Sequence, residues 1–136
     1  MALLFHPKIG DVLVCAFPEC LREPEMTKVR PVIVVTRQHK GRPSLCTVVP
    51  LSTTAPDPIM DYHVRINEQG LPRSLRNQET WAKCDMLYTL CMARLDRVRC
   101  GKDRVTGQRI YETGRITVDE IVRVRKAVAF ALGLAT

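Results

Sequence analysis

The chain has 136 residues, of which 46% are hydrophobic and 26% are charged. A domain of this length buries roughly 68–70% of the surface of its unfolded chain, so it can fold without disulfide or metal cross-links. No apolar run approaches the length of about 18 residues that a membrane-spanning helix requires. We therefore expect one cytoplasmic domain over residues 1–136, with no contact to a membrane.

The charge balance is basic, with 21 Lys and Arg against 14 Asp and Glu and a net charge of +7. Such an excess favours polyanionic partners, although it also serves solubility alone. The metal-binding residue types lack the spacing of a zinc site, because the six cysteines form no Cys-x-x-Cys pair and the three histidines are scattered. We expect reduced cysteines, most of them in the core, and neither a metal ion nor a cofactor.

Strand signals dominate the first half of the chain. A β-branched and aromatic run from Gly10 to Phe17 ends at Pro18, and a charged loop from Glu19 to Val29 follows it. The near-continuous apolar runs 30–36 and 44–51 are joined by a turn-like segment. They predict a hairpin of two central strands.

The pattern changes in the second half. Residues 60–66 alternate, with the apolar side chains at even numbers, and predict a half-exposed strand. A polar turn near residues 70–76 separates this strand from the strand-like runs 80–86 and 87–95. The stretch 94–109 holds six Lys or Arg against two Asp, and two glycines interrupt it. This composition predicts an exposed loop or hairpin.

A helix is predicted from Val118 to Leu132. Thr117 and Glu120 form a capping-box pattern at its start, and Gly133 is a natural stop. Arg125 falls within the apolar stripe, so it either extends to solvent along its aliphatic stem or meets a carboxylate at a subunit contact. The stripe consists of Val118, Ile121, Val122, Val128, Ala129 and Leu132. Short strands followed by one helix indicate a mainly β (α+β), barrel-like fold.

Arg30 is the first candidate site residue. It precedes Pro31, which holds it extended at the point where the long loop enters a central strand. Its guanidinium could bind a phosphate through two parallel hydrogen bonds, whereas the alternative is an ordinary solvated arginine at a strand end.

The hydroxyl cluster Ser52, Thr53 and Thr54 is the second candidate. Its alternative role is to satisfy turn backbone, since Pro56 follows closely. If the two central strands pair antiparallel, the start of the first lies beside the end of the second. Arg30 and Ser52 or Thr53 would then face one cleft.

A series of short motifs follows in order over roughly residues 8 to 134. They are Gly10-Asp11-Val12, Phe17-Pro18, Arg30-Pro31-Val32-Ile33-Val34-Val35, Val49-Pro50-Leu51-Ser52-Thr53, Cys84-Asp85 with Thr89, and Arg94-Leu95. In this order the chain resembles the MazF/PemK family of toxins. The resemblance implies a small SH3-like barrel, shared with the CcdB toxins, that carries a C-terminal α-helix and forms a homodimer with an RNA groove along the dimer contact.

The resemblance also implies an activity and its residues. The family cleaves single-stranded RNA without a metal, and a cognate antitoxin neutralises it by laying an acidic tail over the groove; operator DNA is reached only through the antitoxin complex. The family's catalytic arginine maps onto Arg30, and its threonine maps onto Ser52 with Thr53 adjacent. The residues implied in RNA binding are Lys28, Thr54, Asp85 and Tyr88.

Metal-free cleavage is chemically reasonable because RNA carries its own nucleophile, the 2′-hydroxyl. Arg30 would stabilise the charge that develops on phosphorus, while Ser52 or Thr53 would donate a hydrogen bond to a phosphoryl oxygen. Arginine is a poor base, since its pKa lies above about 12, so the general base stays unassigned.

The chain departs from the family pattern at two positions. Met86 and Tyr88 stand where many members carry a polar amide and a cation. Weaker cleavage or a different base preference would follow, and Asp85 is as readily a turn aspartate as an RNA contact. Two alternatives therefore stay open: a non-catalytic SH3-like binding module, such as a CcdB-like gyrase inhibitor, and a degenerate relative that binds an antitoxin or its operator DNA.

Overall fold

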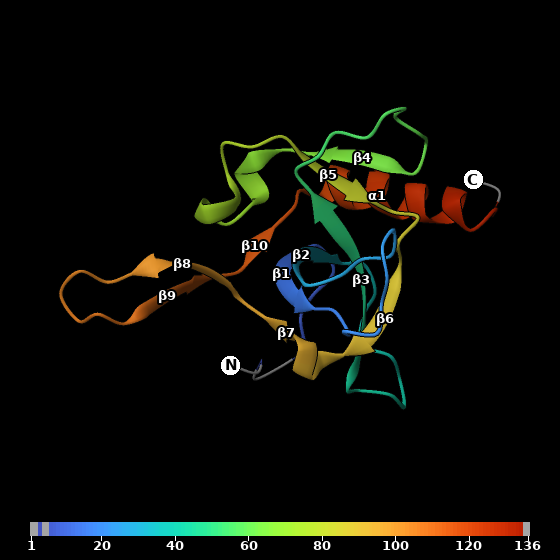
Figure 1. Cartoon of the computed structure of the whole chain (residues 1–136). Coiled ribbons are helices and arrows are strands. Elements are labelled where there is room, and N and C mark those ends of the chain that lie inside the picture. Colours follow the sequence, from blue (N-terminus) through green and yellow to red (C-terminus); the bar gives the residue numbers. More distant parts are fainter. Residues whose placement is uncertain (1–2, 4–5, 135–136) are drawn as a thin grey trace.

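The strands of this protein are short, and most of them belong to one curled antiparallel sheet (Figure 1). The structure is a computed structural model that describes residue 3 and residues 6–134. The elements are β1 (Asp11–Ala16), β2 (Val29–Val34), β3 (Leu45–Ser52), β4 (His63–Ile66), β5 (Thr80–Lys83), β6 (Tyr88–Cys91), β7 (Leu95–Asp96), β8 (Val98–Lys102), β9 (Arg109–Glu112), β10 (Gly114–Arg115) and the helix α1 (Val118–Ala131).

The main sheet has the strand order β10-β1-β2-β3-β5-β4, with β6 added to β3 and β7 added to β1. The hairpin β8–β9 forms a separate two-stranded sheet, as the basic stretch predicted. Three short 3₁₀ helices, Glu68–Gly70, Arg73–Leu75 and Met92–Arg94, connect the strands. The prediction of a mainly β domain with one C-terminal helix is confirmed.

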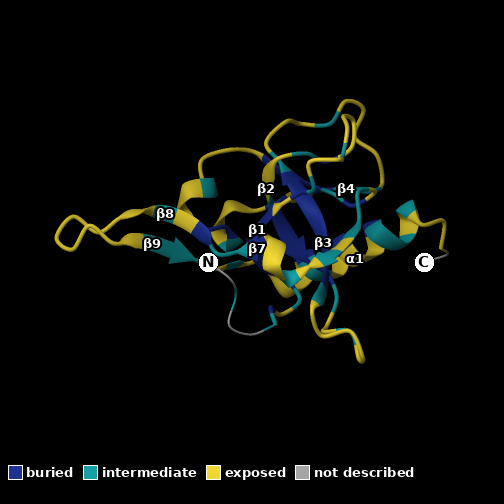
Figure 2. Cartoon of the chain, turned by 60° about the horizontal axis from the view of Figure 1, so that its bottom comes forward, coloured by how far each residue is buried: buried dark blue, intermediate teal, exposed yellow. Residues whose placement is uncertain are grey.

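The central strands β1, β2 and β3 are buried on both faces, which explains their near-continuous apolar sequences (Figure 2). One face contributes Val12, Ile33 and Val49 to a core cluster that also packs against α1 and β4. The other face contributes Leu13, Val32 and Val48 to a second cluster. The sheet is therefore the middle layer of the molecule.

Pro50 lies inside the central strand β3, although proline cannot donate to a ladder. One edge of β3 pairs with β6 from Leu45 to Val48 and with β5 at Leu51 and Ser52. Pro50 falls between these two partners, where no ladder bond from its nitrogen is required. On the other edge it faces Val32 of β2.

The alternating segment 60–66 is a strand only from His63 onward. The backbone N–H of Met60 donates to His63 Nδ1 over 3.0 Å, and the N–H of His63 donates to the Met60 carbonyl over 3.0 Å. The backbone N–H and carbonyl of Met60 are thus bonded within this turn and are not free for strand pairing. Met60 is exposed, whereas Val64 and Ile66 are buried. The predicted run 80–95 is also divided, by a turn in which the N–H of Met86 donates to the Lys83 carbonyl.

The helix begins as predicted. Thr117 and Glu120 form the full capping box, but α1 ends at Ala131, one residue before the predicted end. The predicted apolar stripe is wrong in part, because Val118 and Val122 are 78% and 51% exposed.

The face that α1 presents to the core is formed by Glu120, Val124 and Ala127, flanked by Ile121 and Val128. Glu120 points inward because it accepts hydrogen bonds from Thr117 and from the backbone N–H of Asn67. Arg125 is exposed, and it borders the buried face beside Ile121 and Val124. No helix within the described residues is long and apolar enough to span a membrane.

The six cysteines differ in how far they are buried. Cys15, Cys46 and Cys84 are buried, whereas Cys20 and Cys91 are exposed. The expectation of core cysteines therefore holds for only half of the six, since Cys100 is half-buried. Burial raises the pKa of Cys15 and of Cys46 to about 11 and the pKa of Cys84 to about 12.

These pKa shifts predict selective alkylation of the folded protein. At pH 8 the three buried thiols are almost wholly protonated and out of contact with reagent, because the thiolate is the nucleophile. Iodoacetamide should modify Cys20 and Cys91 first, as peptide mass mapping would show. Unfolding in urea should make the buried thiols react as well, and their rapid reaction in the native protein would contradict this burial.

Candidate active site

The register of β2 and β3 brings the two candidate segments to one end of the sheet. Val32 faces Pro50, Ile33 faces Val49 and Val34 faces Val48. The pairing of β2 with β3 ends at Val32 and Pro50; continued by two residues in the same register, it would set Arg30 opposite Ser52. On the other side of β2, Arg30 pairs with Cys15 of β1. The candidate cation and the candidate hydroxyl therefore lie at the same end of two adjacent strands, beyond the last pair of their ladder.

Arg30 is exposed, and its Nε donates a hydrogen bond to the Thr27 carbonyl over 3.3 Å. Within residues 6–134, none of the ion pairs involves Arg30. The nearby Lys28 has a φ of 67°, and its carbonyl accepts a hydrogen bond from the Phe17 N–H. Two cations thus stand where the loop enters β2, and the guanidinium of Arg30 faces solvent, where a phosphate could reach it.

The hydroxyl cluster takes up the turn role that was its alternative. Ser52 Oγ accepts a hydrogen bond from the Thr54 N–H over 3.1 Å. Ser52 is half-buried, and Thr53 and Thr54 are exposed. A hydroxyl that accepts one bond keeps its own O–H for donation, so the turn orients Ser52 without using up its donor.

Tyr88 lies away from this pair of positions. In the ladder it faces Val48 of β3, and its hydroxyl accepts a hydrogen bond from the Met26 N–H over 3.1 Å. Its ring lies edge-on to Phe17, with 5.1 Å between the ring centroids. Met26 is itself buried, and sequence reasoning missed it as an anchor because it sits in a charged loop without periodicity. Tyr88 therefore fastens the loop between β1 and β2 to the second core cluster.

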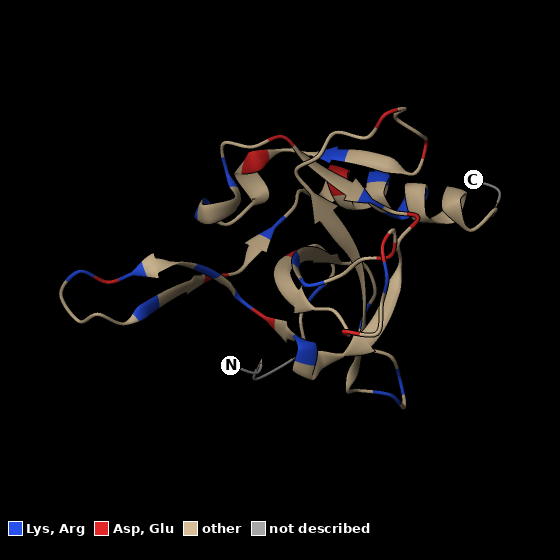
Figure 3. Ribbon diagram, in the orientation of Figure 1, with Lys and Arg blue, Asp and Glu red and all other residues tan. Residues whose placement is uncertain are grey.

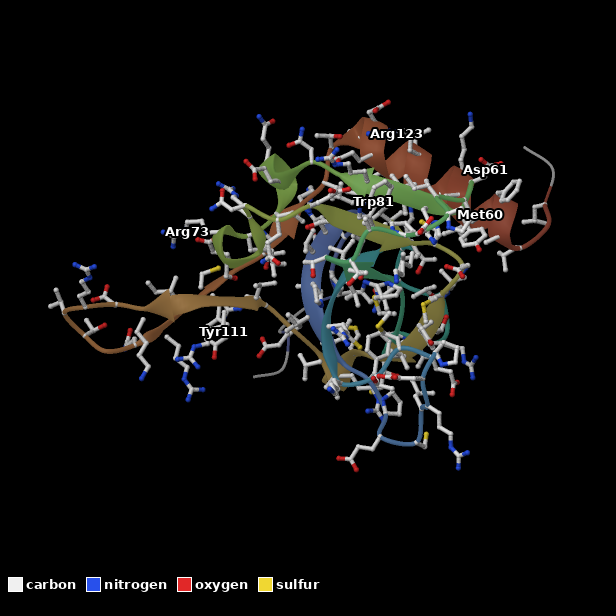
Figure 4. The ribbon with its side chains drawn as sticks, turned by 45° about the horizontal axis from the view of Figure 1, so that its top comes forward. Met60, Asp61, Arg73, Trp81, Tyr111 and Arg123 are labelled. Carbon is white, nitrogen blue, oxygen red and sulfur yellow. The ribbon has the colours of Figure 1, made fainter. Side chains whose placement is uncertain are left out.

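Asp85 lies in the exposed turn between β5 and β6, near His63. Burial lowers the pKa of His63, and the charge of Asp85 opposes that shift. Asp85 thus affects the charge state of His63, in the turn before β4. It belongs to the β5–β6 connection and not to the β2–β3 ladder. Trp81, which Figure 4 labels, is buried and pairs with Ser52 in the β3–β5 ladder.

The substitution Tyr88→Phe should loosen the β1–β2 loop while leaving the core intact. It removes the acceptor of the Met26 N–H, and a lost bond of this kind costs about 1 kcal/mol of unfolding free energy. Limited proteolysis should cut within residues 19–28 faster than in the parent. The matched control is Tyr111→Phe, on a strand outside the main sheet; equal proteolysis of both variants would contradict this role of Tyr88.

A surface pocket of about 630 Å³ lies elsewhere, between β4, the 3₁₀ helix Glu68–Gly70 and the start of α1. Arg65, Glu68 and Arg123 are among its lining residues, and it shares none with the Arg30 and Ser52 positions. Across the described part of the chain, no group of three His, Cys, Asp or Glu side chains is placed to hold a metal ion.

Comparison with known proteins decides the family. Residues 8–132 match the family described as PemK-like, MazF-like toxin of type II toxin–antitoxin system. The chain belongs to this family. It is also 31% identical to the protein YifN of Escherichia coli K12, over 73% of this chain and 78% of that protein.

Solved structures of MazF-like toxins share the fold. MazF of Deinococcus radiodurans superposes with a TM-score of 0.64 at 17% identity, covering 94% of this chain and 97% of that one. An endoribonuclease solved in complex with its cognate antitoxin, from a mycobacterial species, gives a TM-score of 0.62 at 20% identity over 96% and 99% of the two chains. The predicted MazF-like fold is confirmed.

Proposed function

We propose that this MazF-like toxin is an endoribonuclease that cleaves single-stranded RNA without a metal ion. The observation that supports the proposal is the β2–β3 pairing, which brings the strand ends that carry Arg30 and Ser52 to the same end of the sheet in a chain of this family. A cation and a hydroxyl on adjacent strand ends can bind two oxygens of one phosphate. The mycobacterial relative named an endoribonuclease supports the same activity.

In the proposed reaction the 2′-hydroxyl oxygen attacks the adjacent phosphorus, and the bond from phosphorus to the 5′-oxygen breaks. The products are a 2′,3′-cyclic phosphate and a 5′-hydroxyl. Arg30 stabilises the added negative charge and can give a proton to the departing 5′-oxygen, while Ser52 or Thr53 donates a hydrogen bond to a phosphoryl oxygen. The base that takes the 2′-proton is unassigned.

The partners follow from the same proposal. The relative bound to its antitoxin supports a cognate antitoxin for this chain, and we propose that the chain works in the cytoplasm as a homodimer. Lys28 and Thr54 flank the Arg30 and Ser52 positions and would contact the RNA backbone. Operator DNA would be reached only through the antitoxin complex.

The test is incubation of the purified protein with a long single-stranded RNA in EDTA, followed by mapping of the cut ends. Cuts with 2′,3′-cyclic or 3′-phosphate ends are expected. Intact RNA, or cleavage that appears only when a divalent metal is added, would overturn the metal-free mechanism.

One observation favours a second candidate, a non-catalytic binding module of the same fold. Met86 and Tyr88 pack against the second core cluster, and the Tyr88 hydroxyl accepts the Met26 N–H, so both side chains are engaged in the fold. Such a module would slow growth on expression while leaving cellular RNA intact, for example by inhibiting gyrase. Sequencing RNA ends after induction separates the two candidates.

A further inference from the structure

The hairpin of residues 97–113, here called the basic arm, extends away from the curled sheet (Figure 1). Its base is fixed: Val98 is buried, and Glu112 accepts a hydrogen bond from Arg73 Nε over 2.6 Å. The guanidinium of Arg97 lies over the ring of Tyr111, 5.0 Å from its centroid (Figure 4). Residues 101–109 are all exposed. The arm is thus a ribbon anchored at one end with its outer part in solvent.

The outer part of the arm is cationic (Figure 3). Lys102 and Arg109 face each other directly in the β8–β9 ladder, and Arg104 lies in the turn between them. Like charges directly opposite each other destabilise a ladder. An anion bound between Lys102 and Arg109 would offset the repulsion between their positive charges.

The described acidic residues of the arm form no ion pair with these cations and offset only part of their charge, since Asp103 carries one negative charge against three positive ones. Asp103 accepts the backbone N–H groups of Val105 and Thr106 over 2.8 and 3.0 Å, which lowers its pKa and commits it to the turn. Glu112 is paired with Arg73 at the base. In the described part of the chain, none of the ion pairs involves Lys102, Arg104 or Arg109.

We propose that the basic arm is a second RNA-binding element, which grips the phosphate backbone of substrate outside the Arg30 and Ser52 site. The inference rests on the proposed ribonuclease function. Cations from Arg99 to the tip are spread over at most about 17 Å of ribbon, which suits a linear run of phosphates better than one compact anion. Arginine binds phosphate oxygens in bidentate fashion.

The surface of the arm argues against a folded protein as its partner. The centre of a protein interface is typically depleted of charge and rich in aromatic residues. Within the exposed outer part, residues 101–109, the one large apolar side chain is Val105, which is 94% exposed. A sequence-independent contact to phosphates requires no apolar surface.

The test uses a triple variant, Lys102→Gln/Arg104→Gln/Arg109→Gln, and a 30-nucleotide 2′-O-methyl RNA that lacks the nucleophile. We expect the Kd to rise on the order of tenfold at 0.1 M salt and the slope of log K against log salt to fall by about 2. The control Lys40→Gln/Arg42→Gln/Lys126→Gln removes the same charge from exposed positions elsewhere and should stay within about twofold of the parent.

A second variant separates charge from folding. Lys102→Glu creates an opposite-charge pair with Arg109 across the ladder, so the hairpin should become more stable while RNA binding weakens. Equal losses of RNA affinity in the triple variant and the control would overturn the arm proposal. Poly-glutamate tests the alternative of an acidic peptide as partner: a triple variant that loses binding to poly-glutamate but keeps its RNA affinity would also overturn the proposal.

The two proposals fail separately. If the parent cuts RNA and the triple variant binds the 2′-O-methyl probe as tightly as the parent, the arm proposal is wrong and the ribonuclease proposal stands. If the parent cuts no RNA but the triple variant alone loses affinity for the probe, the arm proposal stands without catalysis. A parent that binds no RNA at all would overturn the arm proposal directly.

Discussion

Arg30→Ala should lower the rate of RNA cleavage by about 10²–10³-fold, the usual effect of removing a group that stabilises charge in a transition state. The side chain is exposed and makes one 3.3 Å hydrogen bond, to the Thr27 carbonyl, so its loss should leave the fold intact. The measurement is the single-turnover cleavage rate of a long RNA in EDTA, with far-UV circular dichroism to verify folding.

Two further variants define what Arg30 does. Arg30→Lys keeps the charge but not the bidentate geometry, so it should recover only part of the rate. Arg42→Ala removes an exposed arginine from the turn before β3 and should cleave at the rate of the parent. Cleavage by Arg30→Ala at the rate of this control would show that the charge-stabilising group lies elsewhere.

Glu120→Ala is expected to lower the free energy of unfolding by about 3 kcal/mol, because it leaves several donors without a partner. Glu120 is 2% exposed and accepts the Asn67 N–H over 2.7 Å and the Thr117 N–H over 2.9 Å. It therefore caps α1 and at the same time ties the helix to the segment after β4. Urea unfolding at pH 7 would measure the change.

The adjacent residue supplies the control for this experiment. Asp119 is exposed and pairs with Arg123 over 3.1 Å within the same helix. An exposed pair of this kind contributes little, so Asp119→Ala should change stability by less than about 1 kcal/mol. If Glu120→Ala and Asp119→Ala destabilise equally, the carboxylate of Glu120 does not hold the helix to the sheet.

Sequence reasoning succeeded where the deciding interaction is local. The strands β1 to β3 follow from apolar runs that fit burial on both faces, and the start of α1 follows from Thr117 and Glu120. The hairpin of β8 and β9 follows from the glycines and the charge of the stretch 94–109. In each case the residues that fix the structure are neighbours in the sequence.

The predictions failed where the partner is distant in the sequence. The face of α1 depends on a bond between Glu120 and Asn67, which lie 53 positions apart. The bond of Tyr88 to Met26, at a separation of 62 positions, was likewise not predicted from its own segment. Periodicity within one segment carries no information on such contacts.

The two-sided burial of the central sheet has a consequence for how strand register is specified. In a sheet with one solvent-exposed face, shifting the pairing register of a strand by one residue moves its apolar side chains into water, which costs much free energy. Here a slip of β2 against β3 would exchange one apolar face for another, so the core discriminates weakly. Pro50 restricts β3 on its other edge: it has no N–H to donate, and it lies in the two-residue gap, Val49 and Pro50, between the pairings with β6 and with β5. A proline in the middle of β3 thus helps fix how this strand sits against β5 and β6, and with it the position of Ser52 at the strand end, where it pairs with Trp81.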